Sequence, residues 1–81
     1  MQNIVEFKIW LDKNTKYTKA TKSNIVSRVK RANKIMPIVA DNVYLFRLSN
    51  QAEFQNIPVS VKSQIRRAIR LYLEFMKELG E

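Results

Sequence analysis

The chain has 81 residues, of which 46% are hydrophobic, enough for one modest core but not for a binding domain together with a catalytic domain. It contains no cysteine and no histidine, which excludes disulfides, thiolate nucleophiles, the usual zinc sites and imidazole acid–base catalysis. Fifteen basic residues against seven acidic ones give a net charge of +8, which favours polyanionic partners such as nucleic acid or anionic lipid.

Only carboxylates are left to supply a metal site, and they are scattered along the sequence. The acidic residues are Glu6, Asp12, Asp41, Glu53, Glu74, Glu78 and Glu81. We interpret them as solvated surface charges, so we expect no catalytic residue, no metal, no small-molecule cofactor and no enzymatic activity. No stretch approaches the roughly 20 apolar residues that a membrane span requires. We therefore expect one soluble, cytoplasmic domain over residues 1–81.

The first predicted helix begins after Asn3, a suitable N-cap. Its apolar residues recur at helical spacing: Ile4, Phe7, Trp10 and Leu11. The polar run 12–16 is expected to end the helix after about three turns. Trp10 belongs to the inward side of this pattern, so we expect it in the core rather than stacked on a base.

Thr18 is expected to cap a second helix that runs to Ile35 or Met36, because Pro37 disfavours helical geometry in the preceding residue. At 100° per residue one face of this helix is apolar. It carries Ile25, Val29, Ala32 and Met36, with Val26 at its margin. The opposite face is polar, and no acidic residue occurs between Thr18 and Val39. It carries Lys19, Ser23, Asn24, Ser27, Arg28, Lys30, Arg31 and Lys34.

The middle segment 38–48 is rich in apolar residues but has no clear period. Its pattern leaves open an extended segment or a short irregular turn packed on the core. Ser49 or Asn50 is expected to cap a short helix over 51–54, with Glu53 completing a capping box. The pair Ile57-Pro58 then interrupts this helix.

The last predicted helix has Ser60 as its N-cap and Gly80 at its end. Its apolar residues fall within an arc of roughly 120°: Val61, Ile65, Ala68, Ile69, Tyr72, Phe75, Met76 and Leu79. A basic stripe flanks this arc, and it carries Lys62, Arg66, Arg70 and Lys77, with Arg67 further round. Glu74 and Glu78 lie within helical reach of Arg70 and can pair with it.

Two basic helix faces suit duplex binding, because lysine and arginine neutralise phosphates while serine and asparagine reach phosphate oxygens or base edges. On the second helix we expect Asn24, Ser27, Arg28 and Arg31 to face a DNA groove, since arginine pairs with guanine and asparagine with adenine. On the last helix we expect contacts from Lys62, Ser63, Arg66 and Arg67. The alternative is that both faces are ordinary solvated surface.

The order of elements resembles the N-terminal SAM-like core-binding domain of tyrosine recombinases and phage integrases. The resemblance rests on Phe7-x-x-Trp10-Leu11, on Tyr17-Thr18-x-x-Thr21 opening a helix, on a short middle helix, and on Ala68-x-x-x-Tyr72-Leu73-x-Phe75. It covers nearly the whole chain through hydrophobic and capping patterns. It implies an all-α fold, a small orthogonal bundle of about four helices.

In that family the domain forms half of a clamp around DNA, which implies a role in DNA recombination or DNA integration. Carried over by position, the resemblance implicates Thr21, Asn24, Arg28 and Arg31 on the second helix, and Lys62, Ser63, Arg66, Arg67 and Arg70 on the last. The family's catalytic residues belong to a separate C-terminal domain, so it implies double-stranded DNA and such a domain as partners. Strand exchange by this chain alone is excluded.

Two other functions remain open. The first is a protein–protein interaction module of a larger nuclease-like or restriction-like protein, docking through an exposed Leu71 and the apolar segment from Tyr44 to Phe46. The second is membrane-surface binding, which needs an apolar helix face open to lipid. Here the core requires those faces, so we expect no membrane partner.

Overall fold

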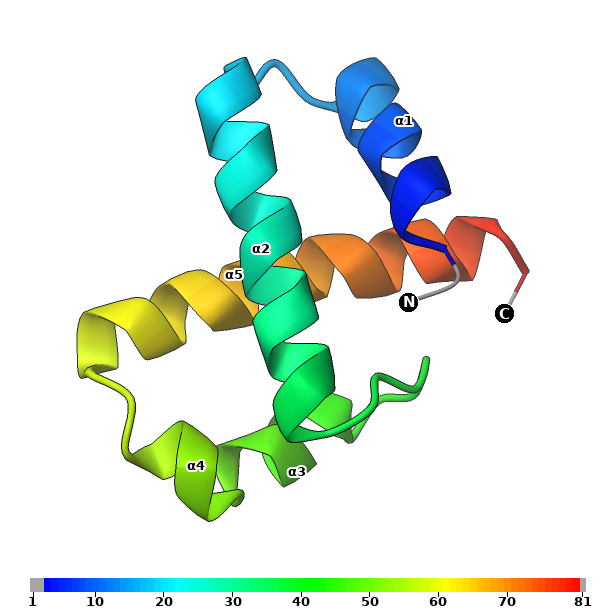
Figure 1. The fold of residues 1–81 in the computed structure, drawn as a ribbon. Helices are drawn as coiled ribbons and strands as arrows, with labels where there is room; N and C mark the ends of the chain where they lie inside the picture. The colour runs from blue at the N-terminus through cyan, green and yellow to red at the C-terminus, as the bar shows by residue number, and fades with distance from the viewer. Residues whose placement is uncertain (1–2, 81) are drawn as a thin grey trace.

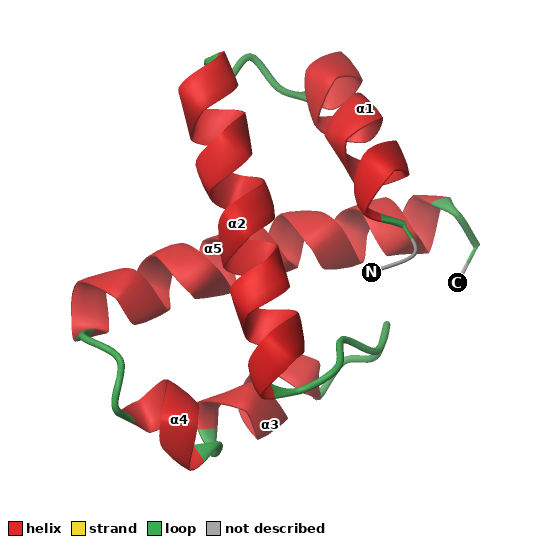
Figure 2. Cartoon of the chain, in the orientation of Figure 1, coloured by secondary structure: helices red, strands yellow, loops and turns green. Residues whose placement is uncertain are grey.

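Five α-helices form over residues 3–80, which are the residues that this computed structural model describes. They are α1 (Ile4–Asn14), α2 (Lys19–Ile35), α3 (Tyr44–Ser49), α4 (Ala52–Gln55) and α5 (Val59–Glu78). The described part of the chain contains no strand (Figure 2). This confirms the predicted all-α class. The number of helices is five rather than about four, because the segment left undecided by the sequence contains α3.

The boundaries of α1 and α2 follow the predicted signals closely. Helix α1 starts after Asn3, although the Asn3 side chain makes no capping hydrogen bond, and it continues through Asn14 instead of breaking at residue 12. The Asn14 amide donates to the backbone oxygen of Trp10 at 2.9 Å, which supports this last turn. Helix α2 begins after Thr18, whose side-chain oxygen accepts a hydrogen bond from the backbone N–H of Thr21 at 3.2 Å.

The predicted capping box at Glu53 is wrong, because Ser49 and Asn50 serve the preceding helix. The Ser49 hydroxyl donates to the backbone oxygen of Leu45 at 2.9 Å, and the Asn50 amide donates to that of Phe46 at 3.0 Å. Both side chains therefore satisfy carbonyls of α3. Helix α4 starts after Gln51 without a side-chain cap.

Helix α5 begins two residues before the predicted start, because its N-cap is Pro58 and not Ser60. The Pro58 carbonyl already accepts the first helical hydrogen bond, from Lys62 N–H at 2.9 Å, so Pro58 is the N-cap and Ser60 lies inside the first turn. The C-terminal end of α5 agrees with the predicted helix end at Gly80. Gly80 has a φ of 82° and its N–H donates to the Lys77 carbonyl at 3.1 Å, a left-handed helix ending that suits glycine.

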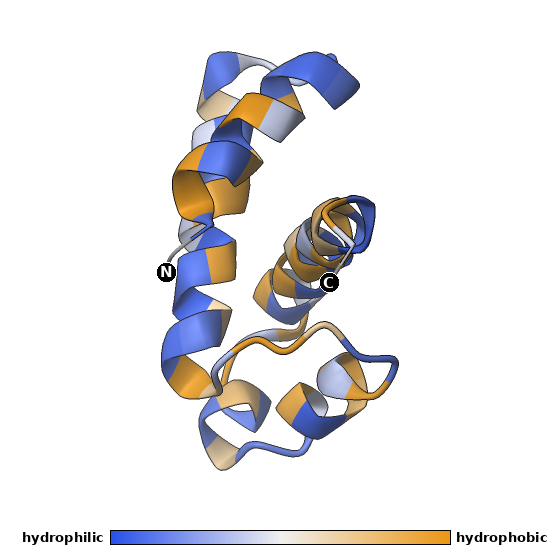
Figure 3. Ribbon diagram, turned by 90° about the vertical axis from the view of Figure 1, so that its right-hand side faces the viewer, coloured by the Kyte–Doolittle hydropathy of each residue, from blue (hydrophilic) through white to orange (hydrophobic). Residues whose placement is uncertain are grey.

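Helix α2 crosses α5, and the two longest helices pack through their apolar faces (Figure 1). Helix α1 runs antiparallel beside the first half of α2, while α3 and α4 lie at the other end of α2 (Figure 1). Viewed from the side, α1 and α2 lie on one side of the interior and α5 on the other (Figure 3). The exposed surfaces of α2 and α5 therefore point in opposite directions.

An aromatic cluster joins α1 to the C-terminal half of α5. The ring of Phe7 lies 5.0 Å from that of Tyr72 in an edge-to-face arrangement and 5.4 Å from that of Phe75. Trp10 is half-buried beside Phe75, with ring centres 6.1 Å apart. Its indole N–H donates to the Glu78 carboxylate at 2.9 Å. Trp10 thus packs against the core, as expected, and also carries a polar contact at its edge.

Tyr44 anchors the middle segment to α2. Its side chain is fully buried, and its hydroxyl donates to the backbone oxygen of Met36 at 2.7 Å. Earlier in the chain, the side-chain oxygen of Asn33 accepts a hydrogen bond from Ile38 N–H at 3.0 Å. This bond fixes the chain where it leaves α2. Of the residues expected at a docking surface, Tyr44 is in the core and Leu71 is half-buried against it, whereas Phe46 is 72% exposed.

Candidate nucleic-acid interface

A hollow of about 330 Å³ lies between α1 and α2, and most of its lining side chains are cationic or carry hydroxyls. We call it the basic hollow. It is lined by Lys8, Leu11 and Asp12 from α1 and by Lys19, Lys22, Ser23, Val26, Ser27 and Lys30 from α2. Four lysines and two serines thus surround a single acid among the described lining residues. This composition suits an anion that accepts several hydrogen bonds, such as a phosphate.

Helix geometry explains why these side chains converge. At 100° per residue, Lys19, Ser23 and Lys30 share the flank of α2 that adjoins its apolar face. The antiparallel α1 runs along that flank and adds Lys8. Leu11 and Val26 are buried, so they form an apolar floor beneath the lysines. Apolar packing between the two helices therefore holds a cationic rim in place.

Lys22 is the lysine of this group with a defined partner. Its ammonium nitrogen donates to the Asp12 carboxylate at 2.6 Å, the one ion pair within 4.0 Å that involves described residues. The Lys22 side chain is 24% exposed and that of Asp12 is 65% exposed. Lys22 is thus packed at the base of the hollow, while the Asp12 carboxylate lies in solvent above it.

The predicted residues on the other flank of α2 lie in more varied surroundings. Asn24 and Arg31 are exposed, whereas Arg28 is half-buried. Thr21 takes part in the helix cap, since Thr18 Oγ1 donates to its hydroxyl oxygen at 3.0 Å. Arg31 and Lys34 line a shallow second hollow of about 230 Å³ together with Glu53 of α4. This flank brings two cations and an acid to one hollow, whereas four lysines and one acid line the basic hollow.

The residues predicted to contact DNA from α5 do not lie beside those predicted on α2. Ser63, Arg67 and Arg70 are exposed, and at 100° per residue they lie on the side of α5 opposite its buried residues. Lys62 is half-buried. Arg66 is held within the molecule, because its guanidinium carbon lies 5.5 Å above the Phe54 ring and its Nη2 donates to Ser49 Oγ at 3.5 Å. Arg66 thus joins α5 to α3 and α4.

The pairing of Arg70 with Glu74 or Glu78 that the sequence allows does not form. No ion pair involves Arg70 among residues 3–80. Glu78 points instead to α1, where it accepts the hydrogen bond of the Trp10 indole. The tertiary contact with α1 takes this carboxylate away from its own helix neighbours. Glu81 lies outside the described residues.

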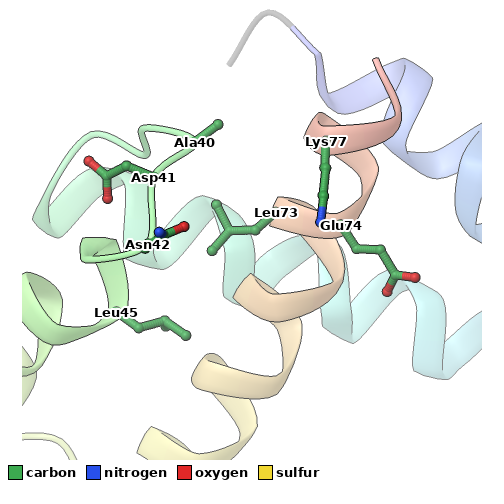
Figure 4. A pocket seen from close by; sticks show the side chains of 7 residues that line it. All are labelled: Ala40, Asp41, Asn42, Leu45, Leu73, Glu74 and Lys77. Atoms are coloured by element: carbon green, nitrogen blue, oxygen red, sulfur yellow. The ribbon is translucent and has the colours of Figure 1, made fainter. Parts of the chain in front are cut away.

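A hollow of about 650 Å³, larger than the basic hollow, lies between residues 40–45 and the second half of α5 (Figure 4). Leu73 points into it from α5, and Leu45 faces Leu73 from α3 (Figure 4). Its charged lining residues are Asp41, Glu74 and Lys77, two acids and one base. Repulsion by the two carboxylates makes it a poor site for a phosphate, so the nucleic-acid candidate is the smaller basic hollow.

Comparisons of the chain with protein-family models, curated proteins and solved structures gave no match. Within residues 3–80, no three carboxylates lie close enough together to hold a metal ion. No helix in this part of the chain has the length and apolar content needed to cross a membrane. The assignment of a function therefore depends on the geometry of the surface.

Sequence reasoning selected Lys19, Ser23, Ser27 and Lys30 but missed Lys8 and the paired Lys22. A usable signal was present, because the connection 15–18 between α1 and α2 is short. Short connections join antiparallel neighbours, which would have placed α1 beside the basic face of α2. Which flank of α2 receives α1 depends on tertiary packing.

Proposed function

We propose that this domain binds double-stranded DNA through α1 and α2, with the phosphate backbone seated at the basic hollow. The observation that carries the proposal is the convergence of Lys8, Lys19, Lys22 and Lys30 from two helices around two serine hydroxyls. Lysine ammonium groups release condensed counterions when they neutralise phosphates, and hydroxyls donate to phosphate oxygens. The net charge of +8 attracts DNA over a longer range.

The dimensions of α2 suit this role. Its 17 residues span about 25 Å at 1.5 Å per residue, and the DNA major groove, about 12 Å wide, admits an α-helix. With the lysine flank on phosphates, the exposed Asn24 and Arg31 lie on the opposite flank, toward base edges. Phosphate contacts would then set affinity, and these two side chains would set sequence preference.

The interface of this proposal uses α1 and α2 rather than α2 and α5 together, because the exposed faces of α2 and α5 point in opposite directions. The resemblance to the core-binding domain of tyrosine recombinases and phage integrases supports duplex DNA as the ligand. It also suggests a C-terminal catalytic domain as a partner, with this domain contributing binding but no chemistry. A domain that forms one half of a clamp needs only one DNA-binding face.

The test is fluorescence anisotropy of a short labelled duplex titrated with protein at several salt concentrations. We compare the wild type with Lys8→Gln/Lys30→Gln, which removes two charges from the basic hollow. The matched control is Arg67→Gln/Arg70→Gln, which removes two charges from the outer face of α5. Each lost phosphate contact should weaken binding about eightfold at 0.1 M salt, or about sixtyfold for two.

We expect this loss for the Lys8/Lys30 variant and a loss of less than about threefold for the control. Equal losses in the two variants would contradict an interface on α1 and α2. Absence of saturable duplex binding by the wild type at low salt would contradict DNA binding altogether. Circular dichroism of each variant establishes that it is folded.

The second candidate, a protein–protein interaction module, is favoured by one observation. Phe46 is 72% exposed on α3, with Val39 and Val43 also exposed nearby in the sequence. An exposed aromatic side chain of this kind is typical of docking surfaces. Phe46→Ser should leave duplex affinity unchanged while abolishing capture of a partner protein, so the two functions are separable.

A further inference from the structure

Asp12 is the one acid among the described residues that line the basic hollow. Its carboxylate lies 2.6 Å from the Lys22 ammonium, so it holds the cation that would otherwise face an incoming phosphate. The carboxylate is also the more exposed member of the pair. It therefore occupies the place, and carries the charge, that a DNA phosphate would have.

We propose that Asp12 is an intramolecular competitor of the DNA backbone, which sets the affinity of the basic hollow below the value its lysines alone would give. This inference rests on the proposed function. A phosphate that enters the hollow must displace the carboxylate from Lys22 or remain close to it and be repelled. The chain thus contains a built-in limit on its own DNA affinity.

The expected size of the effect follows from charge separation. Two like charges about 6 Å apart in the high-dielectric environment of a protein surface lower affinity by about three- to tenfold. The gain from removing the Asp12 charge corresponds to Lys22 becoming free to neutralise one more phosphate, a contact worth about eightfold at 0.1 M salt. The slope of log affinity against log salt should then become steeper by about 0.9.

Asp12→Asn is the variant of choice, because the amide oxygen still accepts a hydrogen bond from Lys22 while the negative charge is lost. The matched control is Asp41→Asn, which changes the net charge by the same amount. Asp41 lines the separate hollow between residues 40–45 and α5. Its side-chain oxygen accepts a hydrogen bond from Val43 N–H, and the side-chain oxygen of asparagine can accept the same bond. Anisotropy with a labelled duplex over a range of salt concentrations gives affinity and slope.

We expect Asp12→Asn to bind the duplex three- to tenfold more tightly and with a steeper salt dependence, and Asp41→Asn to change affinity less than twofold. Loss of the exposed ion pair should lower Tm by about 5 °C or less, so both variants remain folded. Equal affinity of Asp12→Asn and wild type would overturn the inference. Weaker binding would also overturn it, because Asp12 would then act by orienting Lys22.

The failure of this inference is distinguishable from that of the proposed function. If the wild type binds duplex DNA and Asp12→Asn shows no gain, only the competitor role of Asp12 falls. If neither protein binds duplex DNA at low salt, both fall together. A parallel gain of Asp12→Asn and Asp41→Asn would show a general effect of net charge and would likewise overturn the local role.

Discussion

The stability of the domain at high pH should depend on Tyr44. Its side chain is fully buried with the hydroxyl donating to the Met36 carbonyl, and this burial raises the pKa of Tyr44 from 10.0 to about 12. Between these two values the unfolded chain loses the phenolic proton while the folded chain keeps it. The contribution of Tyr44 to the free energy of unfolding is thus fully present below pH 10 and is lost as pH rises toward 12. A pKa difference of about two units corresponds to about 3 kcal/mol.

Tyr44→Phe removes this titration and also the hydrogen bond that the protonated hydroxyl donates, whose loss costs about 1 kcal/mol. Wild type should therefore be more stable than Tyr44→Phe by about 1 kcal/mol below pH 10, and less stable by roughly 2 kcal/mol above pH 12. Urea unfolding followed by circular dichroism at each pH gives both free energies, and lysine titration cancels in their difference. Tyr17→Phe, at a half-buried tyrosine, is the control. A difference between wild type and Tyr44→Phe that stays constant from pH 9 to pH 12 would refute the reasoning.

Two further predictions concern stability in urea unfolding. Phe54→Ala should destabilise the fold by about 3–5 kcal/mol, because the ring is fully buried and also carries the Arg66 guanidinium, whereas Phe46→Ala, at a side chain 72% exposed, should cost less than about 0.5 kcal/mol. Similar costs for the two variants would contradict the packing of α4 against α5. Thr18→Ala should cost about 1 kcal/mol by removing the cap of α2, while Ser60→Ala should be nearly neutral, because Ser60 caps nothing. A larger cost at Ser60 than at Thr18 would contradict these helix boundaries.

Local signals in the sequence predicted three of the helices nearly to their ends. Thr18 and Gly80 act as expected because a threonine cap and a left-handed glycine need only their own backbone neighbours. The apolar spacing of α2 and α5 likewise predicted which faces are buried, since 3.6 residues per turn fixes the face that each side chain shares. The all-α class follows from these patterns.

Local signals in the sequence did not predict the structure of the middle segment 38–48. Helix α3 has six residues, too short for a period to be recognised, and its place depends on the Tyr44 hydroxyl reaching the end of α2. The roles of Ser49 and Asn50 followed from that, because both side chains bond to the helix before them rather than the helix after.

The sequence by itself determined α1, α2 and α5, the buried faces of these three helices, and a net positive charge concentrated on α2. Tertiary structure decided which charges act together. It brought Lys8 to the lysines of α2, set Asp12 against Lys22, and bound Arg66 to Phe54. It also turned the outer face of α5 away from that of α2. Helical periodicity defines the faces of one helix, but the angle and order in which helices pack depend on side chains distant in sequence.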